Sequence, residues 1–232
     1  MTDNIRYELR EGVAVVTMDD GKANAISHAN IEALGEALTR AEGEAGAVLL
    51  TGREGRMSAG FDMSVMTGGI DGVRELVTEG AELLLRMYMH PQPLVAACSG
   101  HALAAGALLL LASDLRIGAK GNFKIGLNEV AIGMTLPIFG VELARARLSP
   151  RHYTRAVTQS RIFDPDTAVE AGFLDSCVEP SELMTAGFAA AKKLSDLSPG
   201  AFKNTKAHER RATAEFIRST LADDMAAIGQ PG

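Results

Sequence analysis

The chain has 232 residues, of which 47% are hydrophobic, and a formal net charge of −6. This length and composition are typical of one globular domain with a sizeable core, or of one domain with a small appendage. Acidic residues outnumber basic ones, 29 to 23, and no basic block stands out, which argues against nucleic acid as a partner.

The first part of the chain alternates strand and helix patterns. Residues 5–19 alternate in polarity around a Glu-Gly break, which predicts a hairpin that leads into a buried strand over 13–18. Ser27 is placed to cap a helix whose apolar residues recur at helical spacing, and a buried strand is expected over 47–52. This order favours a right-handed crossover in a mainly parallel sheet, and therefore an α/β fold.

The middle of the chain continues the alternation. A glycine-rich loop over 52–69 is followed by a predicted helix over 70–89 and a strand over 93–98. The run ALAAGALLLLASD, from residue 102, begins with small residues and then reads as a buried helix. The next segment, LRIGAKGNFKIG, is typical of two strands joined by a turn.

From residue 140 onward the pattern is mostly helical. We expect a core domain over 1–190 and a C-terminal helical region over 191–232. The apolar stripes of the last helices fit packing on a neighbouring subunit or on their own domain equally well. The expected helices cover 140–147, 150–158, 164–171, 181–195, 199–211 and 213–228.

The cysteines, histidines and N-terminus exclude several classes. Cys98 and Cys177 lie in apolar surroundings without CxxC spacing, and the five histidines lack metal-ligand spacing, so neither a disulfide framework nor a metal site is predicted. The run MTDNIRYELREG lacks the plan of a signal peptide. The most apolar run, 102–112, is shorter than the ~20 residues that span a bilayer. These features predict a cytoplasmic protein with no membrane partner.

Two segments rich in small residues follow predicted strands. SAGFD, residues 58–62, and SGHALAAGA, residues 99–107, would each expose peptide N–H groups near a helix start, where a negative charge is favoured. Two such N–H groups could form an oxyanion hole, and small residues would let a carbonyl approach the backbone. The alternative is that these residues only permit tight packing of a helix on a sheet.

A third segment, FKIGLNEVAIGMTLP over 123–137, places Glu129 beside an apolar run. Burial penalises a charged carboxylate, so a buried Glu129 would have a raised pKa and could move a proton near neutrality. The alternative is a surface glutamate at a bend of a loop.

These segments together resemble the motifs of the crotonase (enoyl-CoA hydratase/isomerase) superfamily, in order and over nearly the whole chain. Residues 59–62 are similar to its A-G-x-D motif, and residues 99–106 match N-G-x-A-x-G-G-G loosely. NAI at 24–26 resembles the N-A-L near the adenosine pocket, and AVEAGFLDSCV at 168–178 resembles A-x-x-x-G-L-V-D-x-V.

The resemblance implies a ββα spiral core, a helical C-terminal trimerisation region and a homotrimer or dimer of trimers. It implies no permanently bound cofactor, with coenzyme A as part of a fatty acyl thioester substrate. The N–H groups of Phe61 and Ala105 would form the oxyanion hole, and Glu129 would be the acid/base. The residues implied at coenzyme A are Lys22, Ala23, Asn24, Ala59, Gly60, Phe61, Asp62, Met63 and Ala105.

The resemblance implies that hydratases of this family have two catalytic glutamates. In this chain Leu108 stands at the place of one of them. The delta-3 to delta-2 enoyl-CoA isomerases resemble this chain more closely, because they carry one glutamate in an I-G-L-N-E context. One alternative is a hydratase, or a relative with another reaction, in which Glu129 is the sole acid or Glu142 assists. The other is a catalytically silent acyl-CoA binder. The acyl pocket would be lined by Met63, Met66, Met134 and Phe139.

Two departures from the family motif are notable. Ala104 and Ala105 replace glycines. Alanine still has an N–H group, so the oxyanion hole survives this change provided that the φ angle of the alanine is not positive. His101 would face the acyl pocket or would be a packed or surface histidine.

Overall fold

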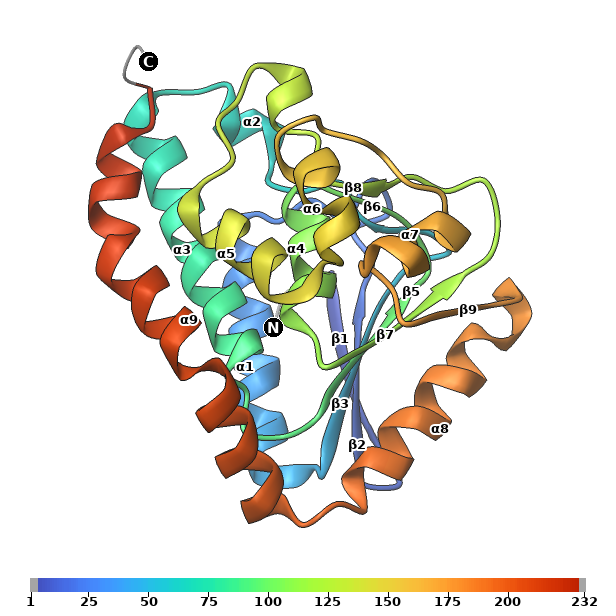
Figure 1. Ribbon diagram of the computed structural model, residues 1–232. Helices are drawn as coiled ribbons and strands as arrows, with labels where there is room; N and C mark the ends of the chain where they lie inside the picture. The colour runs from blue at the N-terminus through green and yellow to red at the C-terminus, as the bar shows by residue number, and fades with distance from the viewer. Residues whose placement is uncertain (1–3, 230–232) are drawn as a thin grey trace.

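The computed structural model describes residues 4–229 and contains two β-sheets (Figure 1). The larger sheet has six strands in the order β1-β2-β3-β5-β7-β9, and its strands are parallel except for the β1–β2 hairpin. The smaller sheet has three parallel strands in the order β4-β6-β8. The larger sheet comprises β1 (Ile5–Arg10), β2 (Val13–Met18), β3 (Ala47–Gly52), β5 (Leu94–Cys98), β7 (Leu115–Ala119) and β9 (Ser176–Val178), and the smaller one β4 (Gly55–Ser58), β6 (Gly100–Leu103) and β8 (Ile125–Gly126).

Helix α1 begins at the predicted cap, because the Ser27 hydroxyl accepts a hydrogen bond from the Asn30 N–H. Helices lie between and after the strands in the described residues. They are α1 (His28–Glu44), α2 (Met63–Met66), α3 (Ile70–Tyr88), α4 (Ala105–Ala112), α5 (Ile138–Arg147), α6 (Pro150–Val157), α7 (Pro165–Ala171), α8 (Leu183–Ser195) and α9 (Pro199–Ala227), with 3₁₀ turns η1 (Val130–Ile132) and η2 (Pro180–Glu182).

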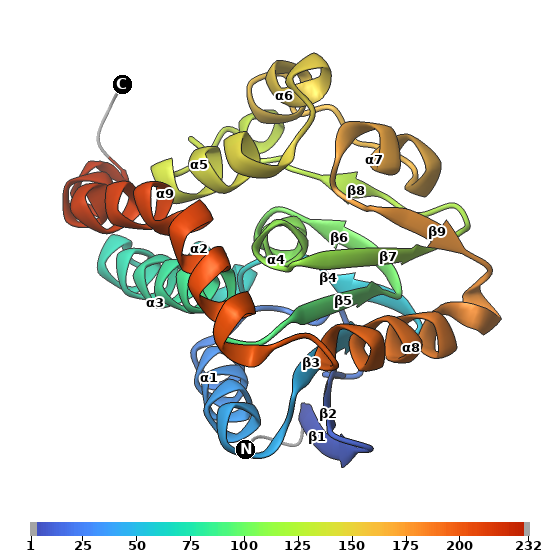
Figure 2. The same cartoon turned by 60° about the horizontal axis from the view of Figure 1, so that its bottom comes forward.

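Helices cover both faces of the larger sheet, and this explains its continuous apolar strands. On β3, Leu49 packs in a core with residues of α8, whereas Val48 and Leu50 face the main core with α1, α3 and α4. Figure 2 views this arrangement with α8 and α4 on opposite sides of the sheet. Because successive side chains of a strand point to opposite faces, one strand supplies both cores.

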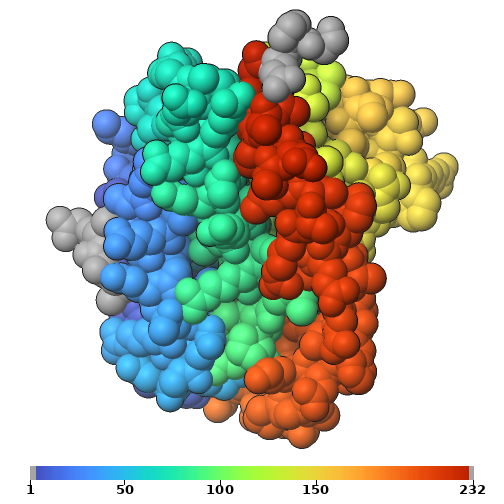
Figure 3. Space-filling model, turned by 90° about the vertical axis from the view of Figure 1, so that its left-hand side faces the viewer, coloured from blue at the N-terminus to red at the C-terminus, as the bar shows by residue number. Residues whose placement is uncertain are grey.

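The last helix, α9, ties distant parts of the chain together. It lies along α3 (Figure 3) and also contacts α5. Its Lys206 and Arg210 side chains are buried and bind Asp114, at the start of β7, over 2.7 and 2.8 Å. Burial lowers the pKa of Lys206 to about 8, although Asp114 opposes this shift.

Several elements differ from the sequence-based expectations. Strand β4 forms inside the expected loop 52–69, β6 occupies the expected start of the helix that begins only at Ala105, and β9 interrupts a region expected to be helical. These strands are short and rich in small residues, so their pairing and not their own propensity makes them strands. Helix α9 is continuous where two helices were expected, since no Gly or Pro separates them.

The domain boundary expected at residue 190 falls inside α8, which runs to Ser195. Residues 1–3 and 230–232, at the two ends of the expected domains, lie outside the described residues. Within residues 4–229, no helix combines the length and apolar character that crossing a membrane requires. The apolar run at 102–112 instead forms β6 and the fully buried helix α4.

Candidate active site

The segment 58–62 pairs with the loop before α1. The Ala59 N–H donates to the Ala23 carbonyl over 3.0 Å, the Ile26 N–H to Gly60 over 2.8 Å, and the Asp62 N–H to Ile26 over 3.1 Å. This parallel bridge leaves out the N–H of Phe61, which donates no hydrogen bond to any residue in 4–229. The predicted oxyanion donor is therefore unpaired in the protein itself.

The loop that holds this segment is organised by Asp20. Its carboxylate accepts hydrogen bonds from the N–H groups of Lys22, Asn24 and Ala25 at 2.7, 2.9 and 3.1 Å. Burial alone would raise the pKa of Asp20, but these donors outweigh it and lower the pKa. The sequence interpretation missed Asp20, although an Asp before a Gly-Lys pair is a signal of such a turn.

Asn24 is fully buried, and its side chain is used inside the protein. Its Nδ2 donates to the carbonyls of Met18 at 2.9 Å and Arg56 at 3.1 Å, and its φ is +52°. A ligand at this place would therefore meet the backbone of the loop and not the Asn24 amide. Lys22 is exposed and Ala23 is half-buried beside it.

The residues after Gly60 point in three directions. The Phe61 ring packs on α3 so closely that a Cβ added at Gly80 would lie 2.2 Å from it. Asp62 caps α2, because its Oδ1 accepts a hydrogen bond from the Ser64 N–H over 2.8 Å. The Met63 side chain is 58% exposed. Phe61 therefore anchors the segment by its ring while its N–H remains free.

The second segment forms β6 and the start of α4. Ala105 is the first residue of α4, and its N–H donates no hydrogen bond within residues 4–229. A Cβ added at Gly60 would lie 3.4 Å from the Ala105 nitrogen, and one added at Gly106 would lie 2.2 Å from the Ser58 carbonyl oxygen. The structure thus brings the two predicted segments together, and glycine permits their close approach.

Ala104 and Ala105 differ in backbone conformation. Ala105 belongs to the helix and its φ is not positive, which is the condition under which an alanine can replace glycine at the predicted oxyanion hole. Ala104, just before it, has φ +51° and ψ −127°. A glycine would adopt these angles more easily than an alanine does.

Unpaired positive charge gathers near the two segments. Lys22, Arg53, Arg56 and Lys124 form no salt bridge with another described residue, whereas the Arg53 Nε donates to the Lys22 carbonyl over 2.8 Å. In the small sheet Arg56 pairs with His101 in register, and His101 in turn accepts from Lys124. Lys22 and Lys124 are far in sequence from Arg53 and Arg56, so no basic block marked the four residues there.

His101 is a packed histidine. Its Nδ1 accepts a hydrogen bond from the Lys124 N–H over 2.9 Å, and its ring meets the Phe123 ring edge-on with centroids 5.5 Å apart. Burial lowers the pKa of His101, and the charges of Arg56 and Lys124 lower it further. The contacts favour the packing alternative over a role in an acyl pocket.

Glu129 is buried without a partner. The residue is only 8% exposed, and its Oε2 has no hydrogen-bond partner among the described residues. Burial raises the pKa of Glu129 to about 6. Its carbonyl accepts from the N–H groups of Ile132 and Met134 at 3.1 and 2.9 Å, which holds the turn. The surface alternative for Glu129 is therefore wrong.

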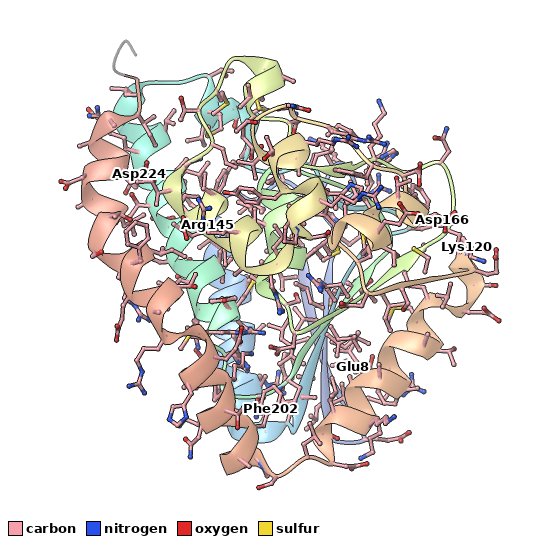
Figure 4. The ribbon with its side chains drawn as sticks, viewed as in Figure 1. Glu8, Lys120, Arg145, Asp166, Phe202 and Asp224 are labelled. Atoms are coloured by element: carbon pink, nitrogen blue, oxygen red, sulfur yellow. The ribbon has the colours of Figure 1, made fainter. Side chains whose placement is uncertain are left out.

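The place of the second family glutamate is apolar. Leu108 is 1% exposed, and its Cδ1 would lie 3.4 Å from a Cβ added at Gly140 on α5, beside Leu136. Glu142, on the same helix, forms an ion pair with Arg145 over 3.1 Å. Arg145, marked in Figure 4, also lies over the ring of Tyr153. Glu142 thus already has a partner.

The segment that carries Glu129 is anchored to α9. Ile138, the first residue of α5, donates its N–H to the Asp224 Oδ2 over 2.7 Å, and Asp224 is marked on α9 in Figure 4. Burial raises the pKa of Asp224, although this hydrogen bond opposes the shift. On the other side, the Ala131 N–H donates to the Ser160 hydroxyl over 3.1 Å.

Of the remaining residues expected at an acyl pocket, Phe139 is buried in the core, whereas Met66 and Met134 are half-buried. Among residues 4–229, no group of three or more His, Cys, Asp and Glu side chains could hold a metal ion.

The enoyl-CoA hydratase/isomerase family model matches residues 8–227. The chain belongs to this family. Among enoyl-CoA hydratase/isomerase relatives, the short-chain-enoyl-CoA hydratase of Clostridium acetobutylicum is 31% identical and covers 98% of this chain and 89% of its own length. Human mitochondrial enoyl-CoA delta isomerase 1 is 30% identical and covers 89% of this chain and 70% of its own length.

The fold is shared with solved members of the family. The crystal structure of an enoyl-CoA hydratase/isomerase family protein from Pseudomonas syringae is 43% identical, covers 97% of both chains and has a TM-score of 0.95. The predicted family and the α/β crotonase fold are therefore confirmed. The named relatives include a hydratase and an isomerase, so the chain is an enzyme of one of these kinds.

Proposed function

We propose that this enzyme is a delta-3 to delta-2 enoyl-CoA isomerase that acts on fatty acyl-CoA thioesters. Two features together carry the proposal. Glu129 is buried, and its Oε2 has no hydrogen-bond partner among the described residues. The place of a second glutamate is taken by the apolar Leu108. A hydratase must hold a water and also protonate a carbon, for which two carboxylates are suited. An isomerase needs one group that accepts a proton and returns it elsewhere.

In the proposed reaction the Glu129 carboxylate removes a proton from C2 of a 3-enoyl thioester. The electron pair of that C–H bond moves into the C1–C2 bond, and negative charge collects on the thioester oxygen. The N–H groups of Phe61 and Ala105 would stabilise this enolate, and neither needs to break a hydrogen bond in the protein first. Glu129 then returns the proton to C4, which places the double bond at C2.

The burial of Glu129 suits this role. A pKa of about 6 leaves the carboxylate mostly ionised near neutrality and makes it a stronger base than an ordinary glutamate. Its Oε2 has no hydrogen-bond partner among the described residues, so this oxygen is available for the substrate proton.

The coenzyme A end of the substrate would lie against the backbone of residues 22–24 and 59–63. We propose that its phosphates are bound by the unpaired side chains of Lys22, Arg53, Arg56 and Lys124. Charged donors that face phosphate form hydrogen bonds stronger than neutral ones. This group explains how an acidic chain can bind an anionic ligand.

The assembly that we propose is a homotrimer or a dimer of trimers that packs through residues 191–232, with residues 1–190 as the catalytic core. Support comes from apolar side chains left in solvent at and before α9, where Leu197 is 47% and Phe216 is 48% exposed. Residues of this kind are typical of an interface between subunits.

The test uses Glu129→Gln and measures products in deuterated water. With a 3-enoyl-CoA we expect the wild type to form the 2-enoyl isomer with little 3-hydroxyacyl-CoA. The variant should lose about 10²- to 10⁴-fold in turnover, because it removes the acid/base, while it still binds acyl-CoA. Glu142→Gln is the matched control, since it changes a glutamate already paired with Arg145, and should stay within about twofold of wild type.

Three outcomes would contradict the proposal. Unchanged isomerisation by Glu129→Gln would exclude Glu129 as the acid/base. Predominant hydration of a 2-enoyl-CoA by the wild type would make the enzyme a hydratase. Acyl-CoA binding without product or deuterium exchange would make it a silent binder.

A further inference from the structure

Ala104 has an unusual backbone conformation for an alanine. Its φ of +51° combined with a ψ of −127° lies outside the small left-handed region that L-residues tolerate. The other non-glycine residues with positive φ in the described chain are Glu11, Asn24 and Ser160. Strained residues of this kind persist only where their surroundings hold them, and they gather at functional sites.

Hydrogen bonds hold Ala104 from two sides. Its N–H donates to the Gly126 carbonyl of β8 over 3.0 Å, and its carbonyl accepts from Ala107 and Leu108 of α4 at 2.9 and 3.2 Å. Ala104 is thus fixed between the small sheet and the helix whose first residue, Ala105, carries a free N–H. The local structure would hold a glycine by the same three hydrogen bonds.

The methyl group of Ala104, in the segment 99–107, lies close to Gly60 of the segment 58–62. A Cβ added at Gly60 would be 3.0 Å from the Ala104 Cβ and 3.2 Å from the Leu103 carbonyl oxygen. Gly60, with φ +99°, directly precedes Phe61. The Ala104 methyl is the nearest of these atoms to the place of a Gly60 Cβ, and the other two, the Leu103 oxygen and the Ala105 nitrogen, belong to the backbone.

We propose that Ala104 is a positioning residue, whose methyl group sets the separation of the Phe61 and Ala105 N–H groups. This inference rests on the proposed function in that the ligand of the two N–H groups is a thioester carbonyl. Strain in the backbone is retained because the methyl group keeps the two donors in place. Glycine would relieve the strain, but it would also remove the spacer.

The experiment compares Ala104→Gly, Ala104→Ser and Glu11→Gly with the wild type. Glu11→Gly is the matched control, because Glu11 has a φ of +48° in the exposed turn between β1 and β2, far from the site in the fold. Ala104→Ser keeps the Cβ atom at a half-buried position. The measurements are kcat and KM for a 3-enoyl-CoA, Tm, and the infrared carbonyl stretch of bound octanoyl-CoA with ¹³C at the thioester carbon.

Both glycine variants should gain roughly 2 to 4 °C in Tm from relief of positive φ. Only Ala104→Gly should lose about tenfold in kcat, with KM within about twofold, since displaced donors lose transition-state stabilisation. Its bound carbonyl should show a smaller shift to low frequency than in the wild type. Ala104→Ser should retain the wild-type kcat and carbonyl shift.

The positioning role would be overturned if Ala104→Gly kept the wild-type kcat and carbonyl shift. It would also be overturned if Ala104→Gly lost Tm together with activity, because Ala104 would then support only the fold. A normal carbonyl shift in a wild type that does not isomerise the substrate would contradict the proposed function but not this role. A wild type that binds no thioester would contradict both the proposed function and the positioning role of Ala104.

Discussion

Glu129 and Leu108 are both buried, but only Glu129 can carry a charge. A carboxyl group without a hydrogen-bond partner in the protein interior is costly for folding, because burial opposes its ionised form. Leu108, in contrast, packs against α5 as an ordinary core residue. A buried ionisable residue that weakens the fold is typical of a functional site, where stability is given up for chemistry.

The raised pKa of Glu129 leads to a pH dependence. A base acts only when it is ionised, so kcat/KM should be constant above the pKa and fall about tenfold for each pH unit below it. With a pKa of about 6, the half-maximum should lie near pH 6. The measurement is kcat/KM for a 3-enoyl-CoA between pH 4.5 and 8.5 at constant ionic strength. A half-maximum near the ordinary glutamate value would show that burial does not tune the base.

At the scale of residues, the sequence predicted Glu129 as a candidate but did not predict the basic residues near the site. Glu129 could be found because a glutamate interrupts an apolar run. The cluster of Lys22, Arg53, Arg56 and Lys124 could not, because strand register and loop contacts bring these residues together.

At the scale of elements, the small sheet β4-β6-β8 brings the two segments of the proposed oxyanion hole side by side. Its strands lead directly into residues 59–61 and Ala104, and α4 lies against β4 at Gly106. Glycine is required at that contact because the Ser58 carbonyl occupies the place of a Cβ atom. The helix can therefore approach the strand closely enough for both N–H groups to share one site.

Gly106→Ala should force α4 away from β4. The added Cβ would be 2.2 Å from the Ser58 oxygen, so we expect a loss of about 1–3 kcal/mol in the free energy of unfolding and a fall in kcat. Gly43→Ala is the control, because Gly43 lies in α1 with nothing within 4 Å of its added Cβ. This control should gain about 0.5–1 kcal/mol. Urea unfolding measures both, and equal changes in the two variants would argue against the clash.

The elements with strong periodicity could be predicted from the sequence, and the small sheet could not. Helices α1 and α3 and strands β2, β3 and β5 have clear apolar patterns and lie close to their expected positions. Residues 55–58 and 100–103 are rich in Gly, Ser and Ala and pair only with segments distant in sequence. Their structure depends on tertiary pairing, which local patterns do not record.

At the scale of the whole molecule, α9 closes the fold by buried charges. The Asp114 carboxylate forms ion pairs with Lys206 and Arg210 and accepts a hydrogen bond from the Leu94 N–H. It therefore joins α9 to the starts of the neighbouring strands β5 and β7. Such a network contributes little when intact, because desolvation offsets attraction, but it is costly to break.

Asp114→Asn should therefore destabilise the enzyme more than Lys206→Met. The first variant leaves the buried Lys206 without an anion and leaves Arg210 with only the exposed Glu209, and we expect it to cost about 3–5 kcal/mol. The second leaves Asp114 bound to Arg210 and the Leu94 N–H, so its cost should be smaller. Urea unfolding at one protein concentration measures both, since the proposed assembly would make stability depend on concentration. A larger loss for Lys206→Met would contradict this account.

The hydrogen bond between Ile138 and Asp224 has a consequence for biosynthesis. The turn at Glu129, the acid/base that we propose, emerges from the ribosome well before the residue that anchors its neighbouring helix. At ordinary translation rates, the residues from 129 to 224 take roughly 5 to 20 s to synthesise. During that interval the proposed acid/base is carried on an unfinished scaffold, because the start of α5 gains its hydrogen bond to Asp224 only when the last turn of α9 has been made.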